Sequence, residues 1–167
     1  PGRQKTDTFC VDESYRTRIY NFIRKEVQSN NRCYIVCPSV EESEELGLKS
    51  VTEVYEELSS RVFTDIKIGL LHGKMTNAQK EAAMKDFVSG STQILVSTTV
   101  IEVGVNVPEA TLMIIENAER FGLATLHQLR GRVGRGEFKS YCILLKLFVQ
   151  KFHFSKHNPQ FLQAHML

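Results

Sequence analysis

Short apolar segments rich in β-branched residues alternate with amphipathic segments along most of this 167-residue chain. The first kind predicts buried strands and the second predicts helices. Strands separated by helices are joined by crossovers, which make the strands parallel and cover both faces of the sheet. We expect strands over residues 8–11, 32–37, 67–71, 93–97, 112–116 and 140–145, and helices over residues 13–28, 48–62, 77–89 and 123–133. The alternation therefore predicts one α/β sandwich with a mostly parallel sheet.

Local signals mark several of these boundaries. Asp12 is a candidate N-cap for the first helix, and Pro38 closes the second strand. Thr76 and Gln79 have the spacing of a capping box, and Gly90 stands where a helix starting there would stop.

Composition narrows the class of protein. With 42% hydrophobic and 24% charged residues, the chain is typical of a single soluble domain that buries its own core. Cys33 and Cys37 are too far apart for a zinc knuckle, so we expect reduced, buried thiols in a cytoplasmic protein and no bound metal. No apolar run approaches the length of a membrane span, and the start of the chain lacks the pattern of a signal peptide.

Charge is unevenly distributed although the net charge is only +2. Residues 41–57 carry seven glutamates against one lysine, whereas residues 120–139 carry five basic residues against one glutamate. The basic stretch is the place where we expect an anion to bind.

The sequence Gln-x-x-Gly-Arg-x-Gly-Arg lies within this basic stretch, at residues 128–135. If the helix continues through it, Gln128, Arg132 and Arg135 share one face. Two guanidinium groups and an amide aimed the same way suit a phosphate chain. A solvated basic surface is the alternative for any pair of arginines, but the joint pattern favours a binding site.

Parallel sheets bind ligands where their strands end, so the loops after the strands are candidate site segments. These loops hold residues 38–39, 72–75, 98–99 and 117–120, and their hydroxyl, imidazole and glycine groups suit a nucleic-acid backbone. In the loop after residue 97, the hydroxyls of Thr98 and Thr99 can bind phosphate, Gly104 allows close approach and Asn106 offers an amide.

A complete site for nucleotide hydrolysis also needs a phosphate cradle and a carboxylate for magnesium. Residues 69–74 lack the spacing of a phosphate loop, and Asp12 with Glu13 does not follow a strong enough strand to be an acidic box. His72 has no nucleophile or metal partner nearby and is assigned at most a substrate contact. The arginines therefore indicate half of a composite site, with ATP held elsewhere.

Residues 34–38, 71–73, 98–108 and 128–135 together resemble the second RecA-like lobe of superfamily-two helicases. Within that group, residues 115–123 followed by 126–135 are similar to bacterial RecG, and the resemblance covers roughly residues 1–145. Mfd-like DNA translocases share these motifs and are the close alternative. The resemblance implies a RecA-like three-layer sandwich that serves as the C-terminal motor lobe of an ATP-dependent DNA helicase, acting in branch migration during repair and recombination.

The resemblance also implies roles for individual residues. Arg132 and Arg135 are expected to act as arginine fingers on the γ-phosphate of ATP, with Gln128 in the same interface, and Gly104 and Asn106 are expected near the nucleotide. In this family aspartate usually stands where this chain has Asn106. The expected DNA contacts, which follow the strands, are Pro38, Ser39, His72, Gly73, Thr98 and Thr99.

The implied partners are branched or forked DNA and two parts of the same polypeptide, the N-terminal RecA-like lobe and a wedge domain. ATP and Mg²⁺ would be held mainly by that first lobe, so this chain alone is expected to be an inactive monomer without membrane contact. Residues 146–167 contain three lysines, three histidines and no acid, and we expect a basic tail, disordered or truncated. A stand-alone nucleic-acid-binding module without ATPase activity remains the alternative, and its binding would weaken steeply with salt.

Overall fold

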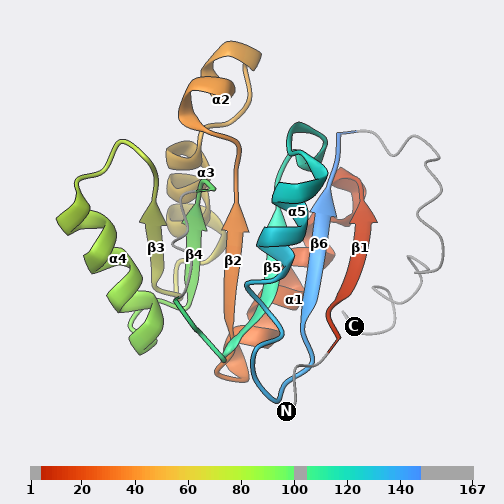
Figure 1. The fold of residues 1–167 in the computed structure, drawn as a ribbon, viewed down its shortest axis with the longest axis vertical. Coiled ribbons are helices and arrows are strands. Elements are labelled where there is room, and N and C mark those ends of the chain that lie inside the picture. The colour runs from red at the N-terminus through yellow and green to blue at the C-terminus, as the bar shows by residue number, and fades with distance from the viewer. Residues whose placement is uncertain (1–4, 100–104, 148–167) are drawn as a thin grey trace.

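The computed structural model describes residues 5–99 and 105–147. Its six strands are all parallel and lie in the order β1-β6-β5-β2-β4-β3 (Figure 1). The strands are β1 (Asp7–Val11), β2 (Arg32–Val36), β3 (Ile68–Leu71), β4 (Ile94–Ser97), β5 (Ala110–Ile115) and β6 (Tyr141–Leu145). The predicted α/β sandwich on a parallel sheet is confirmed.

Helices cover both faces of this sheet. In Figure 1, α4 and α5 lie in front of the strands and α1 and α3 lie behind them. The helical segments are η1 (Glu13–Tyr15), α1 (Arg16–Gln28), α2 (Val40–Leu46), α3 (Val51–Glu57), the π-helical turn η2 (Leu58–Val62), α4 (Asn77–Ser89), η3 (Ala118–Arg120) and α5 (Leu123–Arg130). None of the helices in the described part of the chain has the length and apolar character needed to span a bilayer.

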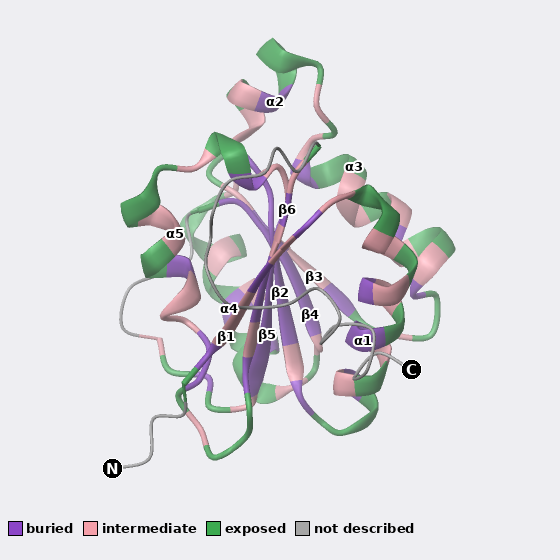
Figure 2. Ribbon diagram, turned by 90° about the vertical axis from the view of Figure 1, so that its right-hand side faces the viewer, coloured by how far each residue is buried: buried purple, intermediate pink, exposed green. Residues whose placement is uncertain are grey.

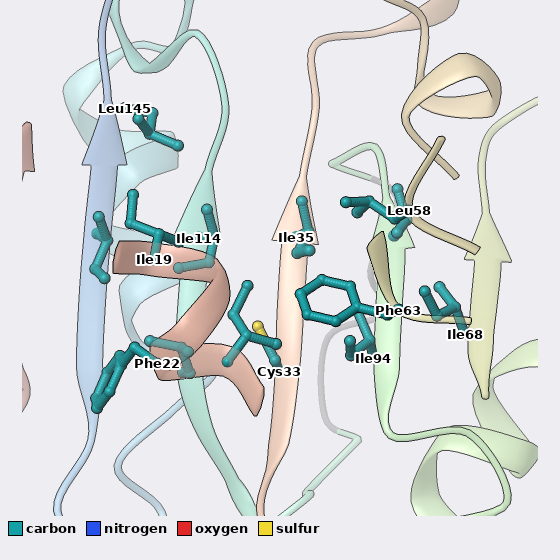
Figure 3. Packing of buried hydrophobic residues seen from close by; sticks show 14 of the residues in the cluster. Ile19, Phe22, Cys33, Ile35, Leu58, Phe63, Ile68, Ile94, Ile114 and Leu145 are labelled. Carbon is teal, nitrogen blue, oxygen red and sulfur yellow. The ribbon is translucent and has the colours of Figure 1, made fainter. Parts of the chain in front are cut away.

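Each face of the sheet has its own hydrophobic core. On the α1 and α3 face, Ile19 and Phe22 pack with Ile35 and Ile114 of the sheet (Figure 3). On the α4 and α5 face, the core surrounds Tyr34 of β2 and includes residues from both helices. All six residues of β5 are buried, which is typical of a strand covered on both faces (Figure 2).

The predicted caps are present where the sequence placed them. Asp12 accepts a hydrogen bond from the backbone N–H of Ser14, at 2.9 Å, and so caps η1, which leads into α1. Thr76 and Gln79 form both hydrogen bonds of the capping box at the start of α4. Gly90 ends that helix with a φ of 84°, a left-handed conformation that favours glycine.

The structure differs from the helix predictions in three places. The helix expected over residues 48–62 begins at Val51, because the Ser50 side chain caps it, and its last turn is π-helical. Helix α2 was not predicted, because its sequence is polar on nearly all sides and has no apolar periodicity. It is delimited by its ends instead, with Ser39 as N-cap and Gly47 at a φ of 65° as its stop.

The prediction of a helix over residues 123–133 was wrong at its end. Helix α5 ends at Arg130, with Gly131 as its C-cap, and Gly134 has a left-handed φ of 78°. The two glycines therefore end the helix rather than weaken its middle. The expected common helical face for Gln128, Arg132 and Arg135 is not present, because both arginines lie beyond the helix.

Candidate functional site

The expected DNA contacts gather at one edge of the sheet. Strands β2, β4 and β3 are neighbours, so the loops that follow them lie side by side at the carboxyl ends of the strands (Figure 1). These loops carry Pro38, Ser39, His72, Gly73, Thr98 and Thr99. Backbone hydrogen bonds join the loops across the edge, from Cys37 N to Ser97 O at 2.8 Å and from Thr98 N to Leu71 O at 3.1 Å. The fold thus brings all six candidates to one edge.

Some of these side chains already have structural partners. The Ser39 hydroxyl accepts from the backbone N–H of Glu42 as the N-cap of α2, and His72 Nδ1 accepts from Lys74 N at 3.2 Å. Thr98 is different, since its hydroxyl oxygen is buried and has no hydrogen-bond partner in the described structure. Thr99 and Gly73 are exposed at the same edge. At this edge, Thr98 therefore has a buried hydroxyl without a partner among the described residues, and Thr99 is exposed beside it.

The arginine segment lies elsewhere, on the face covered by α4 and α5. Val133 is fully buried and Leu129 is nearly so, and both belong to the core around Tyr34. Burial raises the pKa of Tyr34 to about 12, and the positive charges of Arg132 and Arg135 oppose this rise. The segment that carries both arginines is therefore packed on this face of the sheet through Leu129 and Val133.

Local hydrogen bonds hold this segment in place. The Nε–H of Arg135 donates to the carbonyl oxygen of Gly131, at 2.9 Å, and so satisfies one of the carbonyls left free where α5 ends. Arg135 and Gln128 are exposed, and Arg132 is half-buried. A guanidinium has five N–H donors, so Arg135 can use the others for a ligand while this contact persists.

The loop at 105–109 lies beside the arginine segment. Val107 is buried and Val105 packs against the same core as Val133. Asn106, between them, is exposed. The loop of Asn106 and the arginine segment therefore pack against the same core, whereas Gly104 lies outside the described residues.

A charged cluster that was not predicted lies on the other face. Arg16 donates to both carboxylate oxygens of Glu116, at 2.6 and 2.8 Å, and also to Glu13. These residues line a cavity of about 380 Å³, in which Lys49 is paired with Glu57 at 2.6 Å. No sequence motif indicates this cluster, because Arg16 and Glu116 are 100 positions apart. Its charges satisfy one another, which favours a structural role.

Metal-ligating side chains do not cluster within the described ranges: no group of three or more histidine, cysteine, aspartate or glutamate residues there could hold a metal ion. Asp12 and Glu13 have other partners, namely Ser14 and Arg16. The described residues thus offer guanidinium, amide and hydroxyl groups for phosphate.

Comparison with known proteins places this geometry in context. Residues 15–137 match the family model for the helicase conserved C-terminal domain. Similar proteins include the ATP-dependent DNA helicases RecG of Synechocystis sp. and Thermotoga maritima, which are 52% and 50% identical over 145 residues. Each match covers 87% of this chain, but only 17% and 19% of these relatives. The chain thus spans about a fifth of the length of the curated relatives it matches.

Comparison with solved structures also leads to helicases. A structure of RecG bound to a three-way DNA junction has a TM-score of 0.74 at 40% identity, and the match covers 99% of this chain and 22% of that one. Domain 2 of the DEAD-box helicase Mss116p, bound to an RNA duplex, has a TM-score of 0.63 at 21% identity, covering 85% of this chain and 54% of that one. The second likeness concerns the fold alone, and it confirms the RecA-like three-layer architecture.

Proposed function

The chain belongs to the helicase conserved C-terminal domain family, and we propose that it is the second RecA-like motor lobe of an ATP-dependent DNA helicase of the RecG type. The identity of about 50% to RecG proteins over residues that include both arginines favours this type over an Mfd-like translocase. Residues 1–145 would form the lobe, and the role of residues 146–167 stays a prediction.

The observation that carries the proposal is a pair of arginines in a segment that shares its core with the loop of Asn106, while the sequence contains no recognisable phosphate loop. In phosphoryl transfer, a guanidinium supplied from outside the phosphate cradle stabilises the negative charge that develops on the γ-phosphoryl oxygens. We assign that role to Arg132 and Arg135. Gln128 would complete the polar surface, and Asn106 with Gly104 would approach the nucleotide.

The rest of the ATP site would come from a first lobe of the same polypeptide. That lobe would hold most of the nucleotide and the Mg²⁺, because the described residues here contain no carboxylate cluster suited to the ion. Mg²⁺, when bound, neutralises phosphate charge. This lobe would then contribute to turnover only when the two lobes close on ATP.

DNA would bind at the separate edge formed by the ends of β2, β4 and β3. The exposed Thr99 hydroxyl, with Pro38, Ser39, His72 and Gly73 around it, suits the phosphate backbone, which carries no sequence information, and the buried Thr98 hydroxyl would have to turn outward to join it. Because the two arginines and this edge belong to one lobe built on a single sheet, closure of the arginines on ATP would move the DNA-binding edge. Branched or forked DNA is the proposed substrate, with a wedge domain of the same monomer as partner.

The decisive test is Arg135→Ala in the full-length protein. We expect ATP turnover in the presence of forked DNA to fall about 10³-fold, because an arginine finger contributes that much or more. The melting temperature should stay close to that of the wild type, because Arg135 is exposed. Arg61→Ala, at an exposed arginine in η2, is the matched control and should turn over ATP normally.

The outcome that contradicts the proposal is an Arg135→Ala variant that hydrolyses ATP at nearly the wild-type rate. The 167-residue chain alone should bind DNA but hydrolyse no ATP, and a separately supplied first lobe should restore hydrolysis. Robust hydrolysis by the isolated chain would exclude the composite site. No hydrolysis in the full-length protein, with salt-sensitive DNA binding retained, would instead support the stand-alone binding module.

A further inference from the structure

Gly136, directly after Arg135, lies against the backbone of Pro108 at a distance that admits no side chain. A Cβ at this position would be 2.5 Å from the Pro108 carbonyl oxygen, 3.2 Å from its carbonyl carbon and 3.3 Å from its Cβ. The φ of Gly136 is not among the left-handed ones, so the requirement for glycine is one of space. The obstructing atoms belong to a backbone and a rigid ring, which cannot rotate away as a flexible side chain can.

Each of the two loops at this contact is held to the rest of the domain independently of the other. On one side, Val107 is buried and its carbonyl oxygen accepts from Ala110 N at 3.0 Å, which closes a turn just before β5. On the other side, Val133 is buried and Arg135 bonds to the end of α5. Since neither loop is free to slide on the core, the contact between Gly136 and Pro108 determines how closely they approach.

The distance between these two loops sets the separation of two side chains that we propose to contact ATP. Arg135 immediately precedes Gly136, and Asn106 stands two positions before Pro108. We propose that Gly136 is a positioning residue, which by its direct contact with Pro108 places the Arg135 guanidinium and the Asn106 side chain on one ATP molecule. The inference rests on the proposed function and deepens it, because it makes the two loops a single unit of the site.

The test compares Gly136→Ala with Gly122→Ala in the full-length protein. A Cβ at Gly122 has no atom within 4 Å, so this variant controls for glycine replacement as such. For Gly136→Ala we expect kcat with forked DNA to fall about 100-fold, as a misplacement of about 1 Å can cause, while KM for ATP and the melting temperature change little. Gly122→Ala should keep the wild-type kcat.

A second variant covers the case in which Gly136→Ala does not fold. Pro108→Gly adds no atoms but removes the rigid ring, and we expect kcat to fall about tenfold, because the loops lose their fixed separation. Combined with Gly136→Ala, it should recover part of the lost rate, since the flexible backbone can yield to the new Cβ. Wild-type turnover in Pro108→Gly would overturn the inference.

Nuclear magnetic resonance on the 167-residue chain supplies a readout that does not depend on turnover. The Arg135 Nε–H and Asn106 side-chain amide resonances should both shift in Gly136→Ala and stay in place in Gly122→Ala. If both resonances and kcat are unchanged in Gly136→Ala while Arg135→Ala is inactive, the inference fails and the proposed function stands. If Arg135→Ala itself remains active, the proposed function fails.

Discussion

At the residue scale, one arginine joins distant parts of the chain. Arg16, at the start of α1, holds the carboxylate of Glu116, which directly follows β5. Burial alone would lower the pKa of Arg16, but the hydrogen bonds from Glu116 and Glu13 raise it well above its usual value. The pair therefore stays charged and ties α1 to the end of the central strand.

Replacing Glu116 by glutamine should destabilise the protein measurably. Its side chain is only 12% exposed, and losing the negative charge leaves the partly buried Arg16 with Glu13 as its one remaining ion-pair partner among the described residues. We expect a loss of about 2 kcal/mol in the free energy of unfolding, measured by urea denaturation. Glu109→Gln is the matched control, because Glu109 is 45% exposed and its contact with Arg32 is 3.5 Å. The control should cost about 0.5 kcal/mol or less, and equal losses in both variants would contradict the assignment.

At the scale of elements, a helix was predictable where end signals and apolar spacing agreed, whereas α2 was missed because it has end signals without apolar spacing. The boundaries of α4 followed from Thr76, Gln79 and Gly90, because capping hydrogen bonds are local. The end of α5 was misplaced because the apolar spacing continues to Val133, although the chain has already left the helix at Gly131. Val133 lies in the turn after the helix and is nevertheless buried, so its burial depends on the path of the chain beyond α5.

The capping box of α4 gives a prediction at this scale. Thr76→Ala should lower the free energy of unfolding by about 1 kcal/mol, because it removes the hydroxyl that accepts from Gln79 N at 3.2 Å. Denaturant titration followed by circular dichroism measures the loss. Thr52→Ala, at an exposed position inside α3, should be neutral or slightly stabilising, because alanine is the better helix former. A loss as large at Thr52 as at Thr76 would show that the cap is not responsible.

At the scale of the whole molecule, the two cores hold groups that stay neutral. Burial raises the pKa of Cys142 to about 12, from an ordinary value of 9.0, and raises that of Cys33 and Cys37 as well. Cys33 and Cys37 lie in the α1 and α3 core and Cys142 in the other. The expectation of buried thiols is confirmed for these three residues.

These thiols make the fold sensitive to alkali. In the unfolded chain they ionise near pH 9, whereas in the folded chain they remain protonated, so unfolding releases protons above that pH. Their contribution to stability is complete below pH 9 and is lost as the pH rises toward the folded pKa. We expect each buried thiol to lower the free energy of unfolding by about 1 kcal/mol between pH 8 and pH 10.

Urea denaturation at the two pH values measures this loss. Cys142→Ala is the informative variant, because it removes one titrating group and should make the decline with pH shallower by about a third of the thiol contribution. Equal stability of the wild type at pH 8 and pH 10 would contradict the prediction.

The sequence by itself determined what depends on neighbours along the chain. The alternation of strands and helices, the caps at Asp12 and Thr76, and the presence of Gln128, Arg132 and Arg135 in one segment all follow from local spacing. These features are sufficient for a parallel α/β sandwich, because periodicity and capping act over a few residues. Their functional assignment needed the resemblance to a helicase lobe.

The tertiary structure alone decided which distant residues meet. Strand order places the loops after β2, β4 and β3 at one edge, and no local pattern encodes that order. Contacts such as Arg16 with Glu116 and Gly136 with Pro108 depend on crossovers that close around the cores. The physical reason is that the hydrophobic effect is non-directional and stabilises any arrangement that covers the apolar faces of the sheet. Only the packing of the whole chain therefore selects where the arginines and the threonines lie.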